Sequence, residues 1–185
     1  SVSLRYSNVY GPRQSPAGEA GVVAIFSDRL LRGAPVVLYG RELAGDDGCE
    51  RDYVHVEDVV AANLLALGTD LRGAYNVATG VAHDTREVLA AVAAALEVTP
   101  VVEEAPPRAG DLWRCVLDPT RLQAQGWRAR RSFGDGMAHT ARSFVPERRG
   151  ALFVSCRRAR GAGAGRGRRP AAVGWRALGR GEPAR

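Results

Sequence analysis

The residue whose type and position best suit binding chemistry is Arg51, which lies two residues before a short run of β-forming residues from Tyr53 to Val56. Glu57 and Asp58 follow where the apolar pattern changes from period two to period three to four, as when a strand hands over to a helix. Carboxylates at that point suit the positive end of the helix dipole. An arginine placed before a strand can be held rigidly over a cleft. The alternative is a surface ion pair of Arg51 with Asp52 or Glu57, which would contribute little.

The other residue types that carry chemistry offer less. His55 is interpreted as a strand residue and not as a catalyst, and neither His83 nor His139 has a partner visible in the sequence. The cysteines are odd in number, far apart and in no metal-binding or disulfide spacing, so we predict free thiols and no metal site. These cysteines are Cys49, Cys115 and Cys156.

Alternating strands and helices must position these side chains. Apolar periodicity predicts a loop over 7–14, a helix closed by Gly33, and an Asp84–Glu87 capping box that starts a further helix. Asp118 is the predicted N-cap of a short helix that begins at Pro119. The remaining predictions are strands over 2–6, 36–39, 74–78 and 101–102, helices over 22–31 and 58–67, and Trp127 as a core residue. This order predicts an α/β fold built from βα units.

Charge divides the chain into two parts. Residues 1–145 contain 15 Arg and 18 acidic residues, a net charge of −3, whereas residues 146–185 contain 11 Arg and 2 acidic residues, a net charge of +9. We predict one folded domain over 1–145 and a disordered basic tail over 146–185, which has too little apolar surface to offset the cost of ordering. Such a tail could bind RNA or could be an accidental extension, for instance from a shifted reading frame.

Targeting signals are not apparent. No apolar run is long enough to span a bilayer and the first residues are not a signal peptide, so we predict a cytoplasmic protein that does not bind membranes. The only methionine is Met137, so Ser1 is not expected to be the natural start.

Five segments of the sequence form a recognisable series in their order and spacing. They are Leu4–Arg13, Gly21–Phe26, Arg51–Asp58, Tyr75–Gly80 and Pro107–Asp111. This series resembles the nucleotide-sugar epimerases and dehydratases of the extended short-chain dehydrogenase family, and the resemblance runs from Ser1 to about Phe144. The loop from Asp46 to Glu50 is most similar to the UDP-glucose 4-epimerase branch.

The resemblance implies that the chain is the C-terminal, substrate-binding part of an extended Rossmann-type fold. It implies that Arg51 and Arg108 grip the diphosphate of a UDP-sugar. It also implies that Tyr6 and Ser7 lie against the nicotinamide of NAD. The remaining implied substrate contacts are Asn8 near the diphosphate, Val22 and Val23 through their backbone, Val37, Leu38 and Tyr39 beside the base, and Asp111 at the ribose.

The chemistry of these positions agrees with that implication. Guanidinium groups bind phosphate oxygens bidentately, which a lysine does not do as well. For Asn8 the alternative is an Asx-turn in its own loop, and for Asp111 it is the turn after Gly110.

Two features of the family are missing from the sequence. The family's catalytic Tyr-x-x-x-Lys pair cannot be present because every basic residue is Arg, and no Gly-x-Gly-x-x-Gly turn follows a strand. We therefore expect no catalytic residue in this chain and NAD bound mainly by an N-terminal half that precedes it. The whole enzyme is expected to be a homodimeric, NAD-dependent UDP-sugar 4-epimerase that acts by transient oxidation at C4, and the chain alone to be inactive. A dehydratase or reductase of the same family, or a non-catalytic nucleotide-sugar or RNA-binding protein, remains the alternative.

Overall fold

The structure is a computed structural model that describes residues 1–17 and 21–146. The predicted tail lies outside these residues from position 147 onward. No helix in the described part is long and apolar enough to cross a membrane. The strands are β1 Val2–Tyr6, β2 Asn8–Tyr10, β3 Val36–Tyr39, β4 Glu50–Arg51, β5 Tyr53–His55, β6 Gly73–Val77, β7 Val102–Ala105 and β8 Arg114–Cys115. The helices are α1 Val22–Leu31, α2 Val56–Leu67, α3 Thr85–Leu96, α4 Thr120–Gln123 and α5 Phe133–Ser143.

All four strand pairs are parallel: β1 with β6, β2 with β5, β3 with β7, and β4 with β8. Parallel neighbours require a crossover connection, and here helices and long loops provide it. The α/β fold class predicted from the sequence is confirmed.

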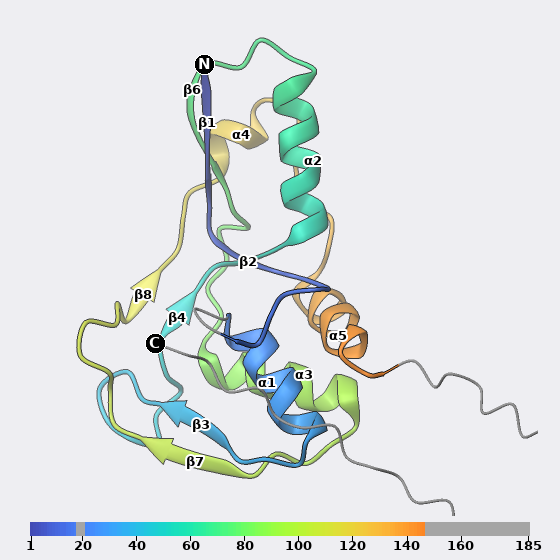
Figure 1. Ribbon diagram of the computed structural model, residues 1–185. Coiled ribbons are helices and arrows are strands. Elements are labelled where there is room, and N and C mark those ends of the chain that lie inside the picture. The colour runs from blue at the N-terminus through green and yellow to red at the C-terminus, as the bar shows by residue number, and fades with distance from the viewer. Residues whose placement is uncertain (18–20, 147–185) are drawn as a thin grey trace, which may run out of the picture. The chain divides into compact units, whose positions relative to one another are not determined.

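One apolar cluster lies between the β1–β6 pair and α2, which run side by side in Figure 1. Tyr75 and Val77 of β6 are buried there together with Val54 of β5. Trp127 is 4% exposed and donates its indole N–H to the carbonyl oxygen of Asp58 at 3.0 Å. The prediction that Trp127 is a core residue is therefore correct.

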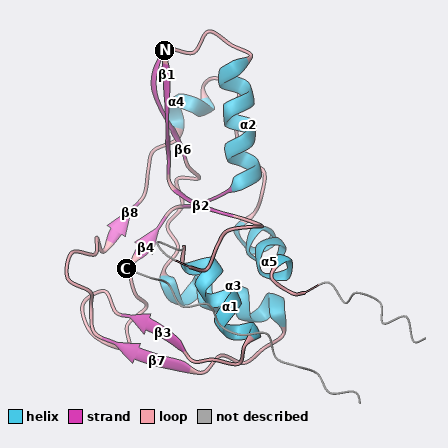
Figure 2. Ribbon diagram, in the orientation of Figure 1, coloured by secondary structure: helices cyan, strands magenta, loops and turns pink. Residues whose placement is uncertain are grey.

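A second apolar cluster joins α1, α3 and α5 to the β3 strand, in the lower part of Figure 2. Phe26 of α1, Val88 of α3 and Met137 of α5 are fully or almost fully buried in it. The predicted capping box of α3 is present, because the Asp84 side chain accepts from the Glu87 N–H and Glu87 accepts from the Asp84 N–H. Two of these helices, α1 and α3, contribute residues to the candidate site.

The structure corrects several element boundaries. Residues 8–10, predicted as loop, form β2 because they pair with β5, and α2 begins at Val56 because the His55 Nδ1 atom caps it by accepting from the Glu57 N–H at 3.2 Å. Pro119, not Asp118, occupies the N-cap position of α4, although Asp118 still accepts from the Thr120 N–H at 2.9 Å.

Candidate functional site

A cavity of about 590 Å³ lies where β2, β3, the segment from Cys49 to Tyr53, the start of α1 and the loop after β7 meet. Most of the site residues expected from the sequence line it. They are Ser7, Asn8, Val22, Val23, Val37, Tyr39, Arg51, Arg108 and Asp111. Segments as distant in sequence as Ser7 and Asp111 thus contribute to one wall.

Two arginines of the cavity have no carboxylate partner among the described residues. The guanidinium group of Arg51 donates to the carbonyl oxygen of its neighbour Glu50, at 2.9 Å, and Arg108 lies over the ring of Tyr39 with its guanidinium carbon 3.6 Å from the ring centroid. Neither takes part in any ion pair among residues 1–17 and 21–146. The surface ion pair considered for Arg51 with Asp52 or Glu57 is therefore not formed, and both guanidinium groups are free to bind an anion.

The N-terminus of α1 adds positive potential to the same cavity. Gly21 occupies the N-cap without a side-chain cap, and the first turn contains no acidic residue. The backbone N–H groups of Val22 and Val23 have no acceptor within the helix at this end, so they remain available to a ligand. Unpaired N–H groups and the helix dipole together favour negative charge.

Asp52 holds the cavity wall together. Its fully buried carboxylate accepts hydrogen bonds from the Ser7 hydroxyl at 3.2 Å, the Thr79 N–H at 2.9 Å and hydroxyl at 2.8 Å, and the Gly80 N–H at 2.8 Å. Its carbonyl oxygen accepts from the backbone N–H of Asn8 at 2.9 Å and from the side-chain amide at 3.3 Å. The Asn8 amide therefore bridges two segments and does not form the Asx-turn that was the alternative.

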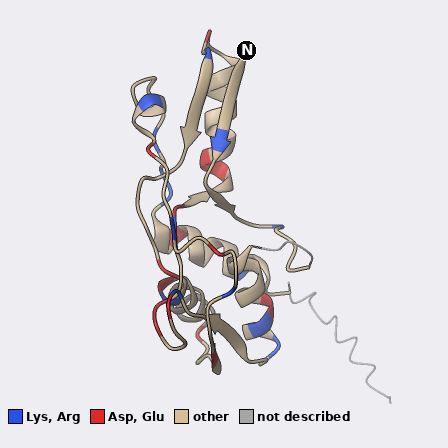
Figure 3. Ribbon diagram, turned by 90° about the vertical axis from the view of Figure 1, so that its left-hand side faces the viewer, with Lys and Arg blue, Asp and Glu red and all other residues tan. Residues whose placement is uncertain are grey.

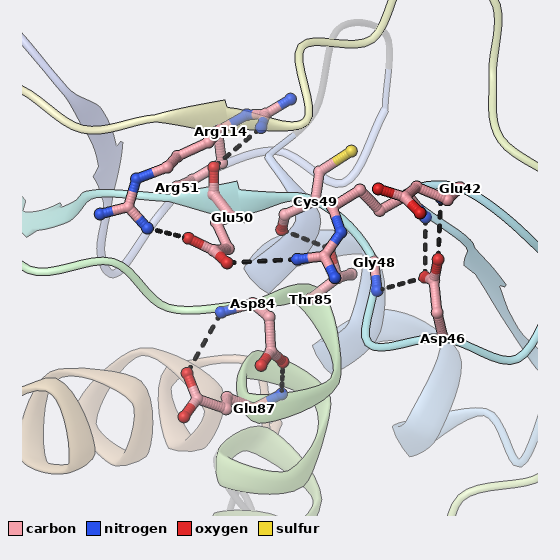
Figure 4. Close-up of polar contacts among 11 residues, drawn as sticks. Glu42, Asp46, Gly48, Cys49, Glu50, Arg51, Asp84, Thr85, Glu87 and Arg114 are labelled. Atoms are coloured by element: carbon pink, nitrogen blue, oxygen red, sulfur yellow. Dashed lines mark hydrogen bonds and ion pairs between the residues drawn. The ribbon is translucent and has the colours of Figure 1, made fainter.

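The loop before Arg51 is ordered by a second carboxylate, Asp46, drawn in Figure 4. It accepts from the backbone N–H groups of Arg41 and Gly48 at 2.7 and 2.8 Å, and from Glu42 at 2.8 Å. These N–H groups, led by that of Glu42, hold the pKa of the Asp46 carboxyl well below its usual range. The loop therefore presents Arg51 from a fixed turn.

Glu50 compensates the positive charge beside Arg51, as Figure 4 shows. Its two carboxylate oxygens pair separately with Arg41, at 3.2 Å, and with Arg114. Because Glu50 is engaged by these two arginines, its carboxylate does not neutralise Arg51.

Two of the expected site residues are placed elsewhere. Leu38 is fully buried in the core, because side chains alternate along β3 and only Val37 and Tyr39 face the cavity. Tyr6 does not line the cavity; it is 44% exposed, and its hydroxyl exchanges a hydrogen bond with Asn63. Asp111 lines the cavity, but its N–H also closes a turn onto the Arg108 carbonyl at 3.2 Å, as the alternative for this residue proposed.

The cavity is also lined by polar residues that the sequence analysis did not predict as site residues. Gln14, Cys49 and Thr85 line it, and the Thr85 hydroxyl donates to the Cys49 carbonyl at 3.1 Å. No periodicity or motif marks such isolated residues in loops and at a helix start, because only the assembled fold brings them together.

Two tyrosines that line the cavity are neutral. Burial raises the pKa of Tyr53 to about 12 and raises the pKa of Tyr10 above its usual range, so neither phenol ionises near neutral pH. Their rings meet edge to face, with centroids 6.2 Å apart. They form an uncharged wall beside the arginines.

A histidine cluster lies beside a separate hollow. His55, Glu57 and His139 each have one atom that could bind a metal ion, and these three atoms lie within 4.8 Å of one another. Their polar atoms are already engaged, since the His55 Nδ1 atom caps α2, its Nε2 atom lies 3.3 Å from the His139 Nδ1 atom, and Glu57 pairs with Arg131. With Nδ1 accepting, the proton of neutral His55 is on Nε2, which leaves no lone pair there for a metal ion.

Charges of both signs are interspersed along the described ribbon in Figure 3. Along the described part of the chain, arginines and acidic residues therefore do not fall into separate basic and acidic segments.

Comparison with known proteins identifies the family to which the chain is similar. The model of the NAD dependent epimerase/dehydratase family matches residues 1–78. The UDP-glucose 4-epimerase of Mycolicibacterium smegmatis is 46% identical over 140 residues, which are 75% of this chain and 43% of that protein.

Two solved structures extend the comparison. The UDP-glucose 4-epimerase of Thermus thermophilus in complex with NAD is 58% identical with a TM-score of 0.74, over 82% of this chain and 47% of that chain. The UDP-glucose 4-epimerase of Thermotoga maritima with UDP-glucose is 40% identical with a TM-score of 0.69, over 77% of this chain and 45% of that chain. The chain thus spans less than half the length of these relatives.

Proposed function

We propose a function from the premise that this chain belongs to the NAD-dependent epimerase/dehydratase family. Its cavity binds a UDP-sugar, UDP-glucose or UDP-galactose, and the protein to which it belongs interconverts the two by transient oxidation at the sugar C4. The role of this chain in that reaction is to bind and orient the substrate.

The observation that carries the proposal is the pair of cavity arginines without carboxylate partners, Arg51 and Arg108, beside the free N-terminus of α1. Adjacent phosphates require several converging donors, and guanidinium groups and helix N–H groups both supply them. A diphosphate would bring negative charge to two guanidinium groups that have no carboxylate partner among the described residues.

The other proposed contacts follow from position. Val37 and Tyr39 form the wall for the base, and Asp111 accepts from the ribose. Asn8 retains its side-chain oxygen and one amide hydrogen for the substrate, since the other hydrogen is donated to Asp52. The structure places Leu38 in the core, so its side chain is not part of the proposed contact set.

The described residues do not fit the whole of NAD, which when bound supplies reversible hydride acceptance. Ser7 lines the cavity and Tyr6 lies outside it, and two such side chains are too few to hold a dinucleotide. The chain contains neither a lysine nor a Gly-x-Gly-x-x-Gly sequence. This agrees with the expectation that NAD is held mainly by residues other than those of this chain.

Titration calorimetry of the chain with UDP and with uridine tests the proposal. The two ligands share a base and a ribose and differ in the diphosphate. Two charge-assisted contacts of about 1.5 kcal/mol each predict binding of UDP that is roughly 100-fold tighter than that of uridine. Equal affinity for the two ligands, or no binding of either, would reject the diphosphate site.

A further inference from the structure

Gln14 contributes a buried acceptor without a partner to the cavity. Its Nε2 atom donates to the carbonyl oxygen of Val9 at 3.3 Å, and its Oε1 atom is buried with no hydrogen-bond partner among the described residues. Exchanging the two atoms would point an oxygen at the Val9 carbonyl, so this contact fixes the orientation of the amide. Buried acceptors almost always have a partner, and an exception calls for one that is supplied from outside the chain.

The surroundings of Gln14 hold its amide in place. A Cβ atom at Gly21 would lie 2.6 Å from Nε2 and 3.2 Å from Oε1, so the side chain fits only because residue 21 is glycine. Both residues line the cavity. The acceptor is therefore fixed at the cavity wall and is not free to rotate into solvent.

We propose that Gln14 is a specificity-determining residue whose Oε1 atom accepts a hydrogen bond from a hydroxyl group of the sugar in the bound nucleotide sugar. This inference rests on the proposed function of the cavity. It goes beyond the diphosphate contacts because it names the residue through which the chain distinguishes a nucleotide sugar from the nucleotide alone.

The topology favours the sugar over the base as the donor. Gln14 is anchored on β2, which pairs with β5, whereas the proposed wall for the base stands on β3, which pairs with β7. Figure 1 shows β2 and β3 well separated, with the diphosphate-binding Arg51 on β4, next to β5 in sequence. A ligand whose base lies on β3 and whose phosphates meet Arg51 extends its sugar toward β2.

Calorimetry with UDP-glucose and UDP tests this inference on the variant Gln14→Met, in which the side chain keeps its length but loses the acceptor. A net contribution typical of a single hydrogen bond predicts that UDP-glucose binds roughly three- to tenfold more weakly, and that UDP binding is unchanged. If the substitution weakens both ligands equally, or neither, the inference is wrong while the diphosphate site stands. If the unaltered chain binds neither ligand, the proposed function itself fails.

Gly21→Ala provides a second variant that leaves Gln14 chemically intact. Its added methyl group must displace the Gln14 amide, so it is expected to lower the affinity for UDP-glucose relative to that for UDP by a similar factor. The ratio of the two affinities is compared because Gly21 is also the N-cap of α1. In the double variant Gln14→Met/Gly21→Ala this ratio should fall no further than in Gln14→Met, because both changes act through the same acceptor. If the loss of relative affinity in the double variant equals the product of the losses in the two single variants, the two changes do not act through the same acceptor.

Discussion

Gly136 of α5 and Tyr10 of β2 approach so closely that a Cβ atom at Gly136 would lie 2.0 Å from the Tyr10 hydroxyl oxygen. Tyr10 is almost fully buried and also lines the cavity. The docking of α5 is therefore coupled to the position of a cavity residue.

Gly136→Ala should destabilise the fold, because the methyl group forces either α5 or the Tyr10 ring to move. Overpacking of this kind costs about 2 kcal/mol, measured as the free energy of unfolding in urea. Gly134→Ala is the matched control on the same helix, since a Cβ atom there meets nothing within 4 Å. That variant should be neutral or slightly stabilising, and equal losses in the two variants would contradict the packing argument.

Asp52→Asn should destabilise the chain by about 3 kcal/mol. The amide nitrogen of asparagine would face either the Thr79 or the Gly80 N–H group, so a buried donor would lose its acceptor. Chemical denaturation measures the change. Asp70→Asn, at an exposed position, is the control and should have no effect. Surface substitutions usually change the free energy of unfolding by less than about 0.5 kcal/mol. A change that small in Asp52→Asn would show that the carboxylate does not hold Ser7, Thr79 and Gly80 together.

Stability should fall as the pH is lowered through the range of histidine titration. Burial lowers the pKa of His55, a shift that Glu57 opposes and that Arg131 and His139 reinforce. The unfolded chain therefore takes up the proton at a higher pH than the folded chain does. The contribution of neutral His55 is complete above the unfolded pKa of about 6.5 and is lost as the pH falls toward the lower folded value.

The variant His55→Asn isolates this contribution, because asparagine can still cap α2 but does not titrate. Thermal melts between about pH 7.5 and 5 should show a smaller loss of stability for the variant than for the unaltered chain. If the two pH profiles are parallel, His55 is not the group responsible.

Purified residues 1–185 should show no epimerase turnover with UDP-galactose and added NAD, since the chain contains no lysine to assist a catalytic tyrosine. A coupled assay for UDP-glucose formation measures this. Measurable turnover would overturn the prediction and would require another base within this chain.

The sequence predicts the elements with strong periodicity or clear caps. The predicted bounds of β1, β3 and α1 and the predicted start of α3 are close to the observed ones, because apolar spacing, Gly33 and the Asp84–Glu87 capping box are local signals. Helix α5 was missed because its sequence contains two glycines and few large apolar residues, although Ser132 accepts from the Asp135 N–H as a recognisable cap.

The cavity itself required the fold. Arg51 and Arg108 are far apart in sequence, and the two-residue strands β4 and β8 that help to align their segments are too short to carry a periodic signal. The resemblance to known enzymes supplied the expectation that these arginines act together. The alternation of β3 could have separated Leu38 from Val37 and Tyr39 on physical grounds alone.

The measurement that tests the account most directly is calorimetric titration of UDP-glucose into the unaltered chain and into Arg51→Ala, Arg51→Lys and Arg32→Ala. Arg32 is an exposed arginine paired with Asp28 outside the cavity. Loss of a charge-assisted contact predicts at least about tenfold weaker binding for Arg51→Ala, a partial loss for Arg51→Lys, and no change for Arg32→Ala. Unchanged affinity in Arg51→Ala, or equal losses in Arg51→Ala and Arg32→Ala, would contradict the central claim that this cavity binds a diphosphate.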